Sequence, residues 1–378
     1  MRFEQVIGQQ EVKMRLLQSV LEGRISHTQM FWGPPGSGKF ALALAYSQYL
    51  NCTNRQENDS CGQCPSCIKA QRLTHPDIHF IFPTTTNKKV KKDPESKLFS
   101  EEWRNFVIAN KGYIGLNQWH EYLGVENKQA SIFVRDGSEI IRRLSFKAYE
   151  GKFKIMIIWM VERLNVTTAN KLLKQLEEPP ENTIFLLIAE QTDQILTTVK
   201  SRAFQVKIPR IDDESLLLAL AETRGVRQAD VKDVAIMAYG NWLEANRLHE
   251  NADDEKFNFH ELRQWMRLCF KDNIPLLIDF CANIGGIGRE RQKAFLQHGL
   301  SLFRNSLINN HHLVELVRLP EDELDFMSKF APFVHHNNLI AFAELMEEGI
   351  RQIERNAYAP LVFMDTSLKM IHLLKMKA

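Results

Sequence analysis

The stretch GPPGSGKF at residues 33–40 constrains the fold of this chain more than any other feature. Its first seven residues match the phosphate loop G-x-x-x-x-G-K of nucleotide-binding proteins. An apolar run that ends at Trp32 precedes it, and the helix-forming run FALALAYSQYL follows it. The residues expected to bind phosphate, through backbone N–H groups and one ammonium charge, are Gly33, Gly36, Gly38 and Lys39. The pattern favours an α/β nucleotide-binding domain over a chance turn rich in glycine and proline.

The magnesium side of this loop lacks its usual residues. Phe40 stands where the motif carries a Ser or Thr hydroxyl, and the apolar run Ile155–Ile158 ends in Trp159 and Met160 where an acidic pair is expected. Glu162, the first acid, would lie roughly 6 Å further on at about 3.3 Å per residue. We therefore expect neither Mg²⁺ binding nor ATP hydrolysis, while binding of ATP or ADP stays open.

Four cysteines fall within the short stretch CTNRQENDSCGQCPSC, spaced C-x8-C-x2-C-x2-C. The candidate metal ligands are Cys52, Cys61, Cys64 and Cys67. Four thiolates with a polar turn between them suit a structural zinc ion. An iron–sulfur cluster and a redox dithiol use related spacings, but the motifs that accompany those sites are missing. Cys269 and Cys281 lie alone in apolar helical surroundings and are interpreted as core residues.

Bulk composition excludes several classes of protein. A chain of 378 residues suggests two or three domains, and 44% hydrophobic with 25% charged residues is typical of globular proteins. The net charge of +2 predicts no global attraction to nucleic acid. No segment approaches the roughly 20 apolar residues of a membrane span, and the charged start MRFEQVIGQQ lacks the apolar core of a signal peptide. We expect a cytoplasmic protein without a membrane partner.

The order of motifs carries a family resemblance. The phosphate loop and the cysteines are followed by HPDIHFI, then NKLLKQLEEPPENTIFLL, then SRAFQV. This order resembles the clamp-loader subunits of bacterial DNA polymerase III, which belong to the AAA+ family, over about the first 250 residues. The resemblance implies an α/β fold: an AAA+ P-loop domain with a parallel sheet, a small helical lid domain and an all-α collar domain.

Departures from the family pattern indicate which branch the chain resembles. The positions that differ from the ATP-hydrolysing subunits are Phe40, Trp159, Met160, the pair Ala189-Glu190, and Leu243. The motif SRA, with Ser201 and Arg202, is kept. In the family that arginine reaches the ATP of a neighbouring subunit, as an arginine finger does. The pattern is similar to the delta-prime branch: a component of the DNA polymerase III holoenzyme without ATPase activity of its own.

The partners implied by the resemblance are the gamma/tau and delta subunits in a hetero-pentamer, the sliding clamp, and primed DNA reached through the complex. Two other functions stay open from the sequence. One is a gamma/tau-type ATPase in which Glu162 replaces the missing acids. The other is a zinc-containing AAA+ adaptor in DNA repair.

The chain is expected to divide into three domains: residues 1–210 form the P-loop domain, 211–252 the lid and 253–378 the collar. Within the first domain, 52–67 is a zinc-binding insertion. Apolar runs predict strands near 29–32, 77–82, 154–159, 184–189 and 204–208, and a helix over 167–178.

A long insertion at 84–130 begins with a run of lysines and continues with aromatic residues. Those noted are Lys88, Lys89, Lys91, Lys92, Trp103, Phe106 and Trp119. Basic residues beside aromatic ones could grip single-stranded DNA. A solvated loop followed by a small helix packed on the domain explains the same pattern, and we favour that interpretation.

Overall fold

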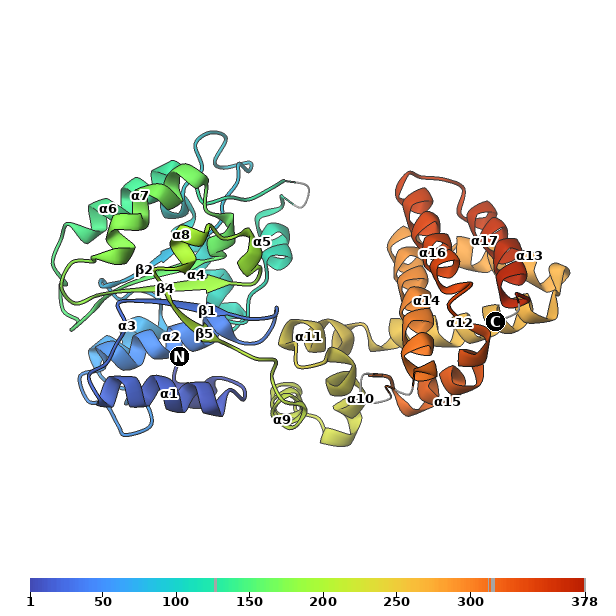
Figure 1. Ribbon diagram of the computed structural model, residues 1–378, viewed down its shortest axis with the longest axis horizontal. Helices are drawn as coiled ribbons and strands as arrows, with labels where there is room; N and C mark the ends of the chain where they lie inside the picture. Colours follow the sequence, from blue (N-terminus) through green and yellow to red (C-terminus); the bar gives the residue numbers. More distant parts are fainter. Residues whose placement is uncertain (126–127, 312, 314–316, 377–378) are drawn as a thin grey trace. The chain divides into compact units, whose positions relative to one another are not determined.

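A computed structural model describes residues 1–125, 128–311, 313 and 317–376 (Figure 1). Contacts divide the chain into two compact units, Met1–Val231 with Ala238–Asn246 and Lys232–Met237 with Arg247–Ala378. The finer division into P-loop, lid and collar domains remains a prediction. Among the helices of the described residues, none is both long and apolar enough to cross a membrane.

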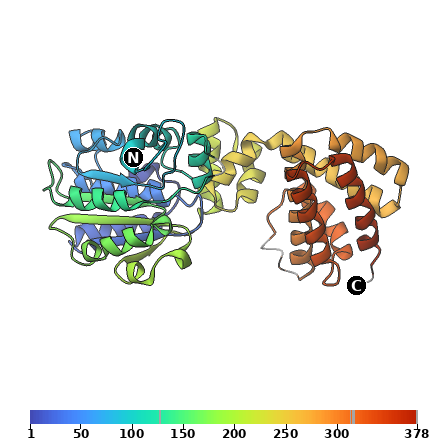
Figure 2. The same ribbon diagram turned by 90° about the horizontal axis from the view of Figure 1, so that it is seen from above.

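A five-stranded parallel sheet forms the centre of the first unit, with strand order β2-β3-β4-β1-β5. Its strands are β1 (Thr28–Trp32), β2 (Ile78–Ile81), β3 (Lys154–Trp159), β4 (Thr183–Ala189) and β5 (Phe204–Lys207). All five lie where the apolar runs predicted them. Every residue of β3 and β4 is buried, because helices cover both faces of the sheet (Figures 1 and 2).

The helices around the sheet are α1 (Gln10–Leu21), α2 (Lys39–Asn51), α3 (Pro65–Gln71), α4 (Ser100–Ala109), α5 (Leu116–Leu123), α6 (Val134–Leu144), α7 (Val166–Glu177) and α8 (Thr197–Lys200). Helix α7 matches the predicted helix within one residue at each end. The Asn165 side chain accepts a hydrogen bond from the Thr167 N–H at 2.9 Å and so caps its first turn. Pro179 and Pro180 follow its last turn, where they prevent further helix.

Short 3-10 helices are η1 (Phe3–Gln5), η2 (Ser96–Phe99), η3 (Val161–Arg163), η4 (Thr192–Gln194) and η6 (Ala331–Phe333). The remaining chain is helical: α9 (Asp213–Arg224), α10 (Gln228–Ala238), α11 (Trp242–Glu250), α12 (Ala252–Lys271), α13 (Ile274–Gly285), α14 (Arg289–Asn310), α15 (Glu321–Phe330), α16 (Leu339–Glu354) and α17 (Ala359–Leu374). The predicted all-α character of this region is confirmed for the described residues.

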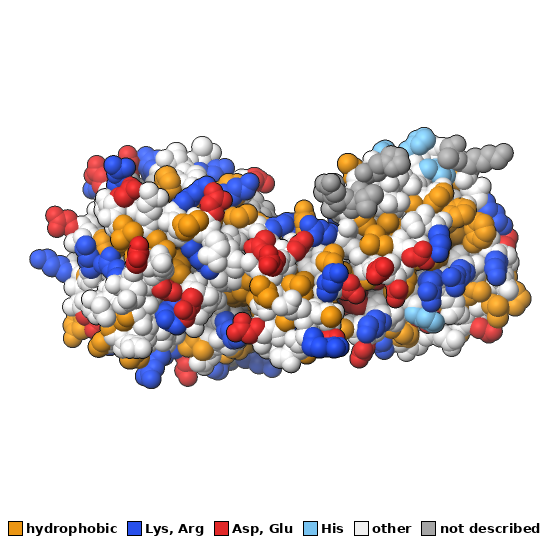
Figure 3. Space-filling model, turned by 90° about the horizontal axis from the view of Figure 1, so that it is seen from below, with side chains coloured by type: hydrophobic (Ala, Val, Ile, Leu, Met, Phe, Trp, Pro, Cys, Tyr) orange, Lys and Arg blue, Asp and Glu red, His pale blue; other side chains and the backbone are white. Residues whose placement is uncertain are grey.

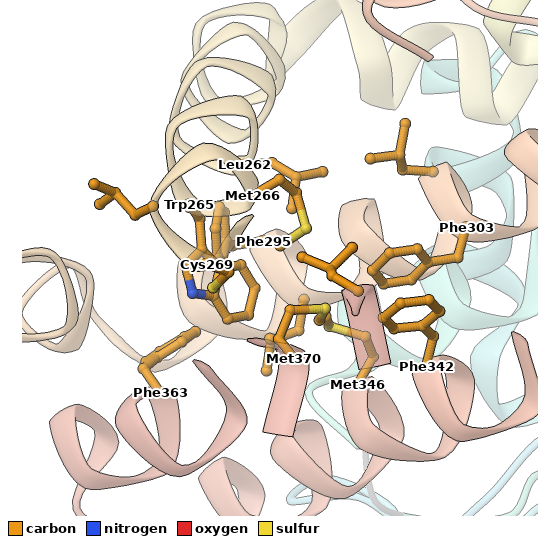
Figure 4. Packing of buried hydrophobic residues seen from close by; sticks show 14 of the residues in the cluster. Leu262, Trp265, Met266, Cys269, Phe295, Phe303, Phe342, Met346, Phe363 and Met370 are labelled. Carbon is orange, nitrogen blue, oxygen red and sulfur yellow. The ribbon is translucent and has the colours of Figure 1, made fainter. Parts of the chain in front are cut away.

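Aromatic rings pack with methionine and aliphatic side chains in the core of the second unit (Figure 4). Phe303 of α14 and Phe342 of α16 stack with ring centroids 4.5 Å apart. Trp265 of α12 is fully buried and donates a hydrogen bond from Nε1 to Ser367 Oγ at 2.8 Å. Cys269 and Cys281 are buried in this core, as predicted.

The insertion at 84–130 folds onto the first unit as η2, α4 and α5, and its residues 126–127 lie outside the described part of the chain. Trp103 and Phe106 are each 2% exposed and Trp119 is 0% exposed. These rings cannot stack on DNA bases, so the interpretation of the insertion as a DNA grip built on these aromatics is wrong. The packed-helix interpretation is confirmed.

Candidate functional site

The phosphate loop lies between β1 and α2, as the motif requires. Gly33 follows β1, and a Cβ on it would lie 2.0 Å from the Ile208 carbonyl oxygen, so no other residue fits there. Gly36 has a left-handed φ of +68°, which favours glycine. Gly38, also left-handed, is the N-cap residue of α2. The three glycines therefore lie at positions that favour or require glycine, and phosphate binding by them and Lys39 remains a prediction.

Lys39 is already held by acceptors of its own unit. Its side chain is 5% exposed, and its Nζ donates to the Pro34 carbonyl oxygen at 2.5 Å and to Glu190 Oε1 at 3.4 Å. Burial lowers the pKa of Lys39, while the Glu190 carboxylate opposes that shift. A phosphate at this loop would have to compete with these two acceptors.

Hydrocarbon fills the side of the loop where magnesium ligands are expected. Phe40 is 3% exposed, and its ring centroid lies 5.6 Å from that of Trp103 and 6.5 Å from that of Trp159. The rings of Trp103 and Trp159 are themselves 5.1 Å apart. Magnesium needs oxygen ligands in near-octahedral geometry, and these three side chains supply none.

Glu162, the acid considered as a replacement, is engaged with the backbone. Its Oε1 accepts hydrogen bonds from the N–H groups of Glu190 and Gln191 at 2.8 and 3.1 Å. Burial raises the pKa of the Glu162 carboxyl above its ordinary value. The carboxylate therefore holds the end of β4 in place through two backbone contacts.

Tyr113, from the insertion, reaches the phosphate loop and was missed by sequence reasoning. Its hydroxyl accepts a hydrogen bond from the Ile7 N–H at 2.8 Å, and a Cβ on Gly38 would lie 3.1 Å from its ring. Burial raises the pKa of this hydroxyl. Ile7 belongs to the stretch VIGQ near the start of the chain. No local pattern marks Tyr113, because its role depends on how the insertion packs.

The start of α11, with Asn241 before it, contacts the phosphate loop and the insertion. The Trp242 N–H donates to the Gly36 carbonyl oxygen at 3.1 Å, and a Cβ on Gly36 would lie 1.7 Å from Asn241 Oδ1. Leu243, where the related ATPases carry a lid arginine, lies against Gly115 of the insertion. Both contacts lie within the first unit.

Arg202 lies in the turn between α8 and β5, and its side chain is 30% exposed. Its Nε donates to Glu177 Oε2 at 2.9 Å and its Nη1 to the Thr198 carbonyl oxygen at 3.1 Å. The preceding Ser201 hydroxyl donates to the same carbonyl at 3.3 Å. The guanidinium is thus held at the surface by α7 and α8, and Glu177 is a partner that the sequence did not reveal.

The four cysteines come together as predicted. The sulfur atoms of Cys52, Cys61, Cys64 and Cys67 all lie within 4.8 Å of one another. Cys52 and Cys61 sulfurs are 3.6 Å apart, and those of Cys61 and Cys67 are 3.9 Å apart. Tetrahedral zinc with bonds of about 2.3 Å places sulfurs about 3.8 Å apart. The donor set and its spacing could therefore hold a metal ion such as zinc.

Backbone N–H groups within the cysteine segment donate hydrogen bonds to the cysteine sulfurs. Those of Cys61, Cys64 and Cys67 each point at the sulfur of the preceding cysteine, at 3.3 to 3.4 Å. Such contacts stabilise negative thiolates. Proline at the first position of α3 begins the helix that carries Cys67.

Comparison with known proteins identifies a protein family that this chain matches. The family model described as "DNA polymerase III, delta subunit" matches residues 8–212. The chain is 28% identical over 236 residues to DNA polymerase III subunit delta' of Pseudomonas aeruginosa, which covers 62% of this chain and 59% of that protein. It is 30% identical over 216 residues to subunit delta' of Yersinia pestis, covering 57% and 51% respectively.

A third relative belongs to the other branch. Subunit tau of Bacillus subtilis is 25% identical over 256 residues, covering 66% of this chain and 38% of that protein. The chain spans about half the length of the curated relatives it matches.

Proposed function

The chain belongs to the DNA polymerase III delta-subunit family, and we propose on this basis that it is a clamp-loader subunit of the delta-prime type. It would assemble with gamma/tau and delta subunits into a hetero-pentamer of the DNA polymerase III holoenzyme. The complex places the sliding clamp on primed DNA, while this chain contributes no ATP hydrolysis of its own.

The hydrocarbon cluster beside the phosphate loop is the observation that favours a delta-prime subunit over a gamma/tau-type ATPase. Phe40, Trp103 and Trp159 occupy the magnesium side, and only Phe40 and Trp159 replace residues of the motif. Trp103 comes from the insertion and adds a third ring, so reversing the motif residues one at a time would not make room for a hydrated cation. This packing supports a subunit in which the phosphate loop has a structural role and does not take part in ATP hydrolysis.

In the alternative, a gamma/tau-type ATPase, Glu162 would have to serve the metal or the attacking water. Its Oε1 already accepts two backbone N–H groups, and its raised pKa weakens it as a ligand at acidic pH. Lys39 faces Glu190, which removes part of the charge available to a nucleotide. Both contacts favour the delta-prime assignment.

Arg202 is the residue through which this chain would assist catalysis in a neighbouring subunit. Its guanidinium carries five N–H donors, and the pairing with Glu177 and Thr198 uses only part of them. An arginine that is held in place yet partly exposed can present its free donors to a phosphate across an interface. Ser201 would support the turn that holds it.

Zinc, held by Cys52, Cys61, Cys64 and Cys67, would have a structural role in this protein. Four thiolate ligands leave no open position for water or substrate. The cluster ties the end of α2 to the start of α3, since Cys52 follows α2 and Cys64 precedes α3. The metal would therefore stabilise the covering layer of the sheet.

The decisive experiment measures ATP hydrolysis by the purified chain and by the reconstituted clamp loader. We expect no magnesium-dependent turnover by the chain alone. In the complex, Arg202→Ala should lower turnover at the neighbouring site by about 10³-fold or more, as for other arginine fingers. Arg15→Ala is the control, because Arg15, like Arg202, is an arginine paired with a glutamate, in this case Glu11.

Robust hydrolysis by the chain alone, abolished by Lys39→Ala, would replace the delta-prime assignment with the gamma/tau alternative. Equal rates for Arg202→Ala and Arg15→Ala complexes, with assembly intact, would remove the role proposed for Arg202.

A further inference from the structure

A groove of about 770 Å³ runs along β2, and none of the phosphate loop residues 33–40 lines it. Among the described residues, strand β2 pairs only with β3 and is therefore an edge strand. Its outward side forms the floor of the groove with His79 and Phe80. One wall consists of Lys97 and the first turns of α4, and the other of the end of α6 and residues 146–149.

Positive charge is concentrated in this groove. The basic side chains that line it are Lys97, Arg104, Arg142, Arg143, Lys147 and Lys154, whereas the acids are Asp77 and Glu139. On the face of the molecule shown in Figure 3, by contrast, basic and acidic side chains are mixed. The whole chain has 48 Lys and Arg against 46 Asp and Glu. The groove therefore departs from the charge balance of the whole chain.

Both acids of the groove are already engaged. Glu139 accepts hydrogen bonds from Arg142 at 2.7 Å and from Arg143 at 2.8 Å, and these lower its pKa to about 2. Asp77 accepts from the N–H groups of residues 149–151 at 2.6 to 2.9 Å. Glu139 is therefore committed to the two arginines, whereas Asp77 keeps its negative charge, which acts on Lys154.

Several cations of the groove remain available to a ligand. Lys97 and Lys147 are exposed. The Nε of Arg104 is buried and has no hydrogen-bond partner among the described residues. An anionic ligand that reached this donor would supply the missing hydrogen bond. These three groups lie on both walls, so a ligand between them would be held from two sides.

Aromatic rings at the rim offer stacking surfaces. Tyr149 is 84% exposed and Phe146 is 60% exposed, and both line the groove. The Arg142 guanidinium lies over the Phe146 ring at 5.9 Å, which leaves Tyr149 as the open ring. Large exposed aromatics beside lysines and arginines are the combination used to bind single-stranded nucleic acid.

An added peptide strand is disfavoured by the hydrogen bonding of the edge. The Ser96 hydroxyl bonds to both the N–H and the carbonyl of Phe82, at 3.1 and 3.0 Å. The Ile78 N–H donates to the His75 carbonyl at 3.2 Å. Because alternate residues of β2 face β3, only Phe80 is left with an outward N–H and carbonyl. A peptide would gain few ladder hydrogen bonds here.

We propose that this groove binds single-stranded DNA. Phosphates would lie between Lys97 and Arg104 on one wall and Lys147 on the other, and a base would stack on Tyr149. The site belongs to the chain by itself and does not depend on its role in a clamp loader, so the test uses the isolated full-length protein.

The test is the fluorescence anisotropy of a labelled 20-nucleotide oligothymidylate titrated with the full-length chain at several salt concentrations. Lys97→Ala/Lys147→Ala should weaken binding about tenfold and reduce the salt slope by about 1.4, at about 0.7 for each lost phosphate contact. The matched control is Lys91→Ala/Lys92→Ala, which removes two exposed lysines outside the groove. It should bind like the unmodified chain.

Stacking is tested separately from charge. Tyr149→Ala should weaken binding by about fivefold or more without changing the salt slope, and Tyr149→Phe should retain it. Circular dichroism melts are the check that each variant is folded.

Four results would overturn the proposal. The first two are no binding by the unmodified chain and equal weakening of binding by both double-lysine variants. The others are equal affinity for a 20-base-pair duplex, and displacement of the oligothymidylate by a ten-residue polyglutamate peptide at a lower concentration than unlabelled oligothymidylate requires. The last result would assign the groove to an acidic peptide.

Discussion

Phe40 illustrates how one residue can change the chemistry of a site without changing its backbone. The loop keeps its left-handed glycines, and α2 begins at Lys39 as the motif predicts. The ring that replaces the hydroxyl is packed between Phe80, Trp103 and Trp159. The side chain has thus become part of the core of the unit.

From this packing we predict that Phe40→Thr does not create an ATPase. The new hydroxyl would face indole rings, and its burial beside them should lower the free energy of unfolding by about 3 kcal/mol, near the lower end for loss of a buried ring. Phe40→Leu, which keeps an apolar side chain, is the control and should cost less. Urea unfolding and a magnesium-dependent ATPase assay measure the two effects. Hydrolysis by Phe40→Thr would show that the pocket is not closed by packing.

At the scale of elements, the cysteine loop and α3 show how a short helix can be fixed by ligands. Helix α3 has only seven residues, too few for independent stability. Its Ser66 hydroxyl donates to the Asn51 carbonyl at 2.7 Å and also bonds to His75 Nε2 at 3.0 Å. The cysteines add the remaining constraint between α2 and α3.

We predict that Cys64→Ser abolishes bound zinc and lowers the melting temperature of the chain. In small zinc peptides, structural zinc contributes an apparent folding free energy of roughly 10 to 16 kcal/mol. A large domain should lose less stability when the metal is removed. Metal content by mass spectrometry and thermal unfolding are the measurements. Cys281→Ser is the control for metal content, because Cys281 lies in the core of the second unit. Zinc-free unmodified protein of undiminished stability would disprove the assignment.

Strand β2 carries a titratable group that should make stability depend on pH. Burial, followed by the nearby charges of Arg143 and Lys154, lowers the pKa of His79 from 6.5 to about 4, against the opposing Asp77 and Glu139. The unfolded chain therefore binds a proton at a pH where the folded chain does not. Stability from this group is present above pH 6.5 and is lost as pH falls toward about 4.

The test is the free energy of unfolding between pH 7 and pH 4 for the unmodified chain and for His79→Gln. The slope over this interval should be smaller for His79→Gln. His260→Gln, at a histidine whose side chain is 61% exposed, is the control and should keep the original slope. Identical slopes for all three proteins would contradict the pKa shift of His79.

For the whole molecule, separate hydrophobic cores underlie the two units. One core lies between one face of the sheet and helices α6, α7 and α8, and the other fills the bundle α12–α17. Trp265 is central to the second core, with rings of Phe280, Phe295 and Phe363 within 6.1 Å of its own. Removal of this ring should therefore lower the stability of the whole bundle.

We predict that Trp265→Ala destabilises the second unit by about 3–5 kcal/mol, since it leaves a cavity and removes the hydrogen bond from Trp265 to Ser367. Hydrogen exchange of peptides from α12, α14 and α17 measures the loss. Leu276→Ala, at a position 50% exposed on α13, is the control and should change exchange little. Unchanged protection in Trp265→Ala would mean that other rings define the core.

Local patterns were enough to predict a large part of this structure. The strands β3 and β4 are recognisable because strands covered on both faces require continuous apolar runs. The phosphate loop and the cysteine cluster are recognisable because their function depends on residues close together in the chain. The helix α7 follows from its apolar spacing, its cap and the prolines after it.

Contacts between distant segments could be found only in the folded chain. Tyr113 and Ile7 are 106 positions apart, and Arg202 and Glu177 are 25 apart. The groove along β2 joins α4, α6 and two loops that share no sequence pattern. Spacing in the chain encodes local backbone geometry and the face of a helix or strand, whereas pairing across the molecule depends on the order of strands in the sheet. That is why the closure of the phosphate loop and the charged groove emerge only from tertiary structure.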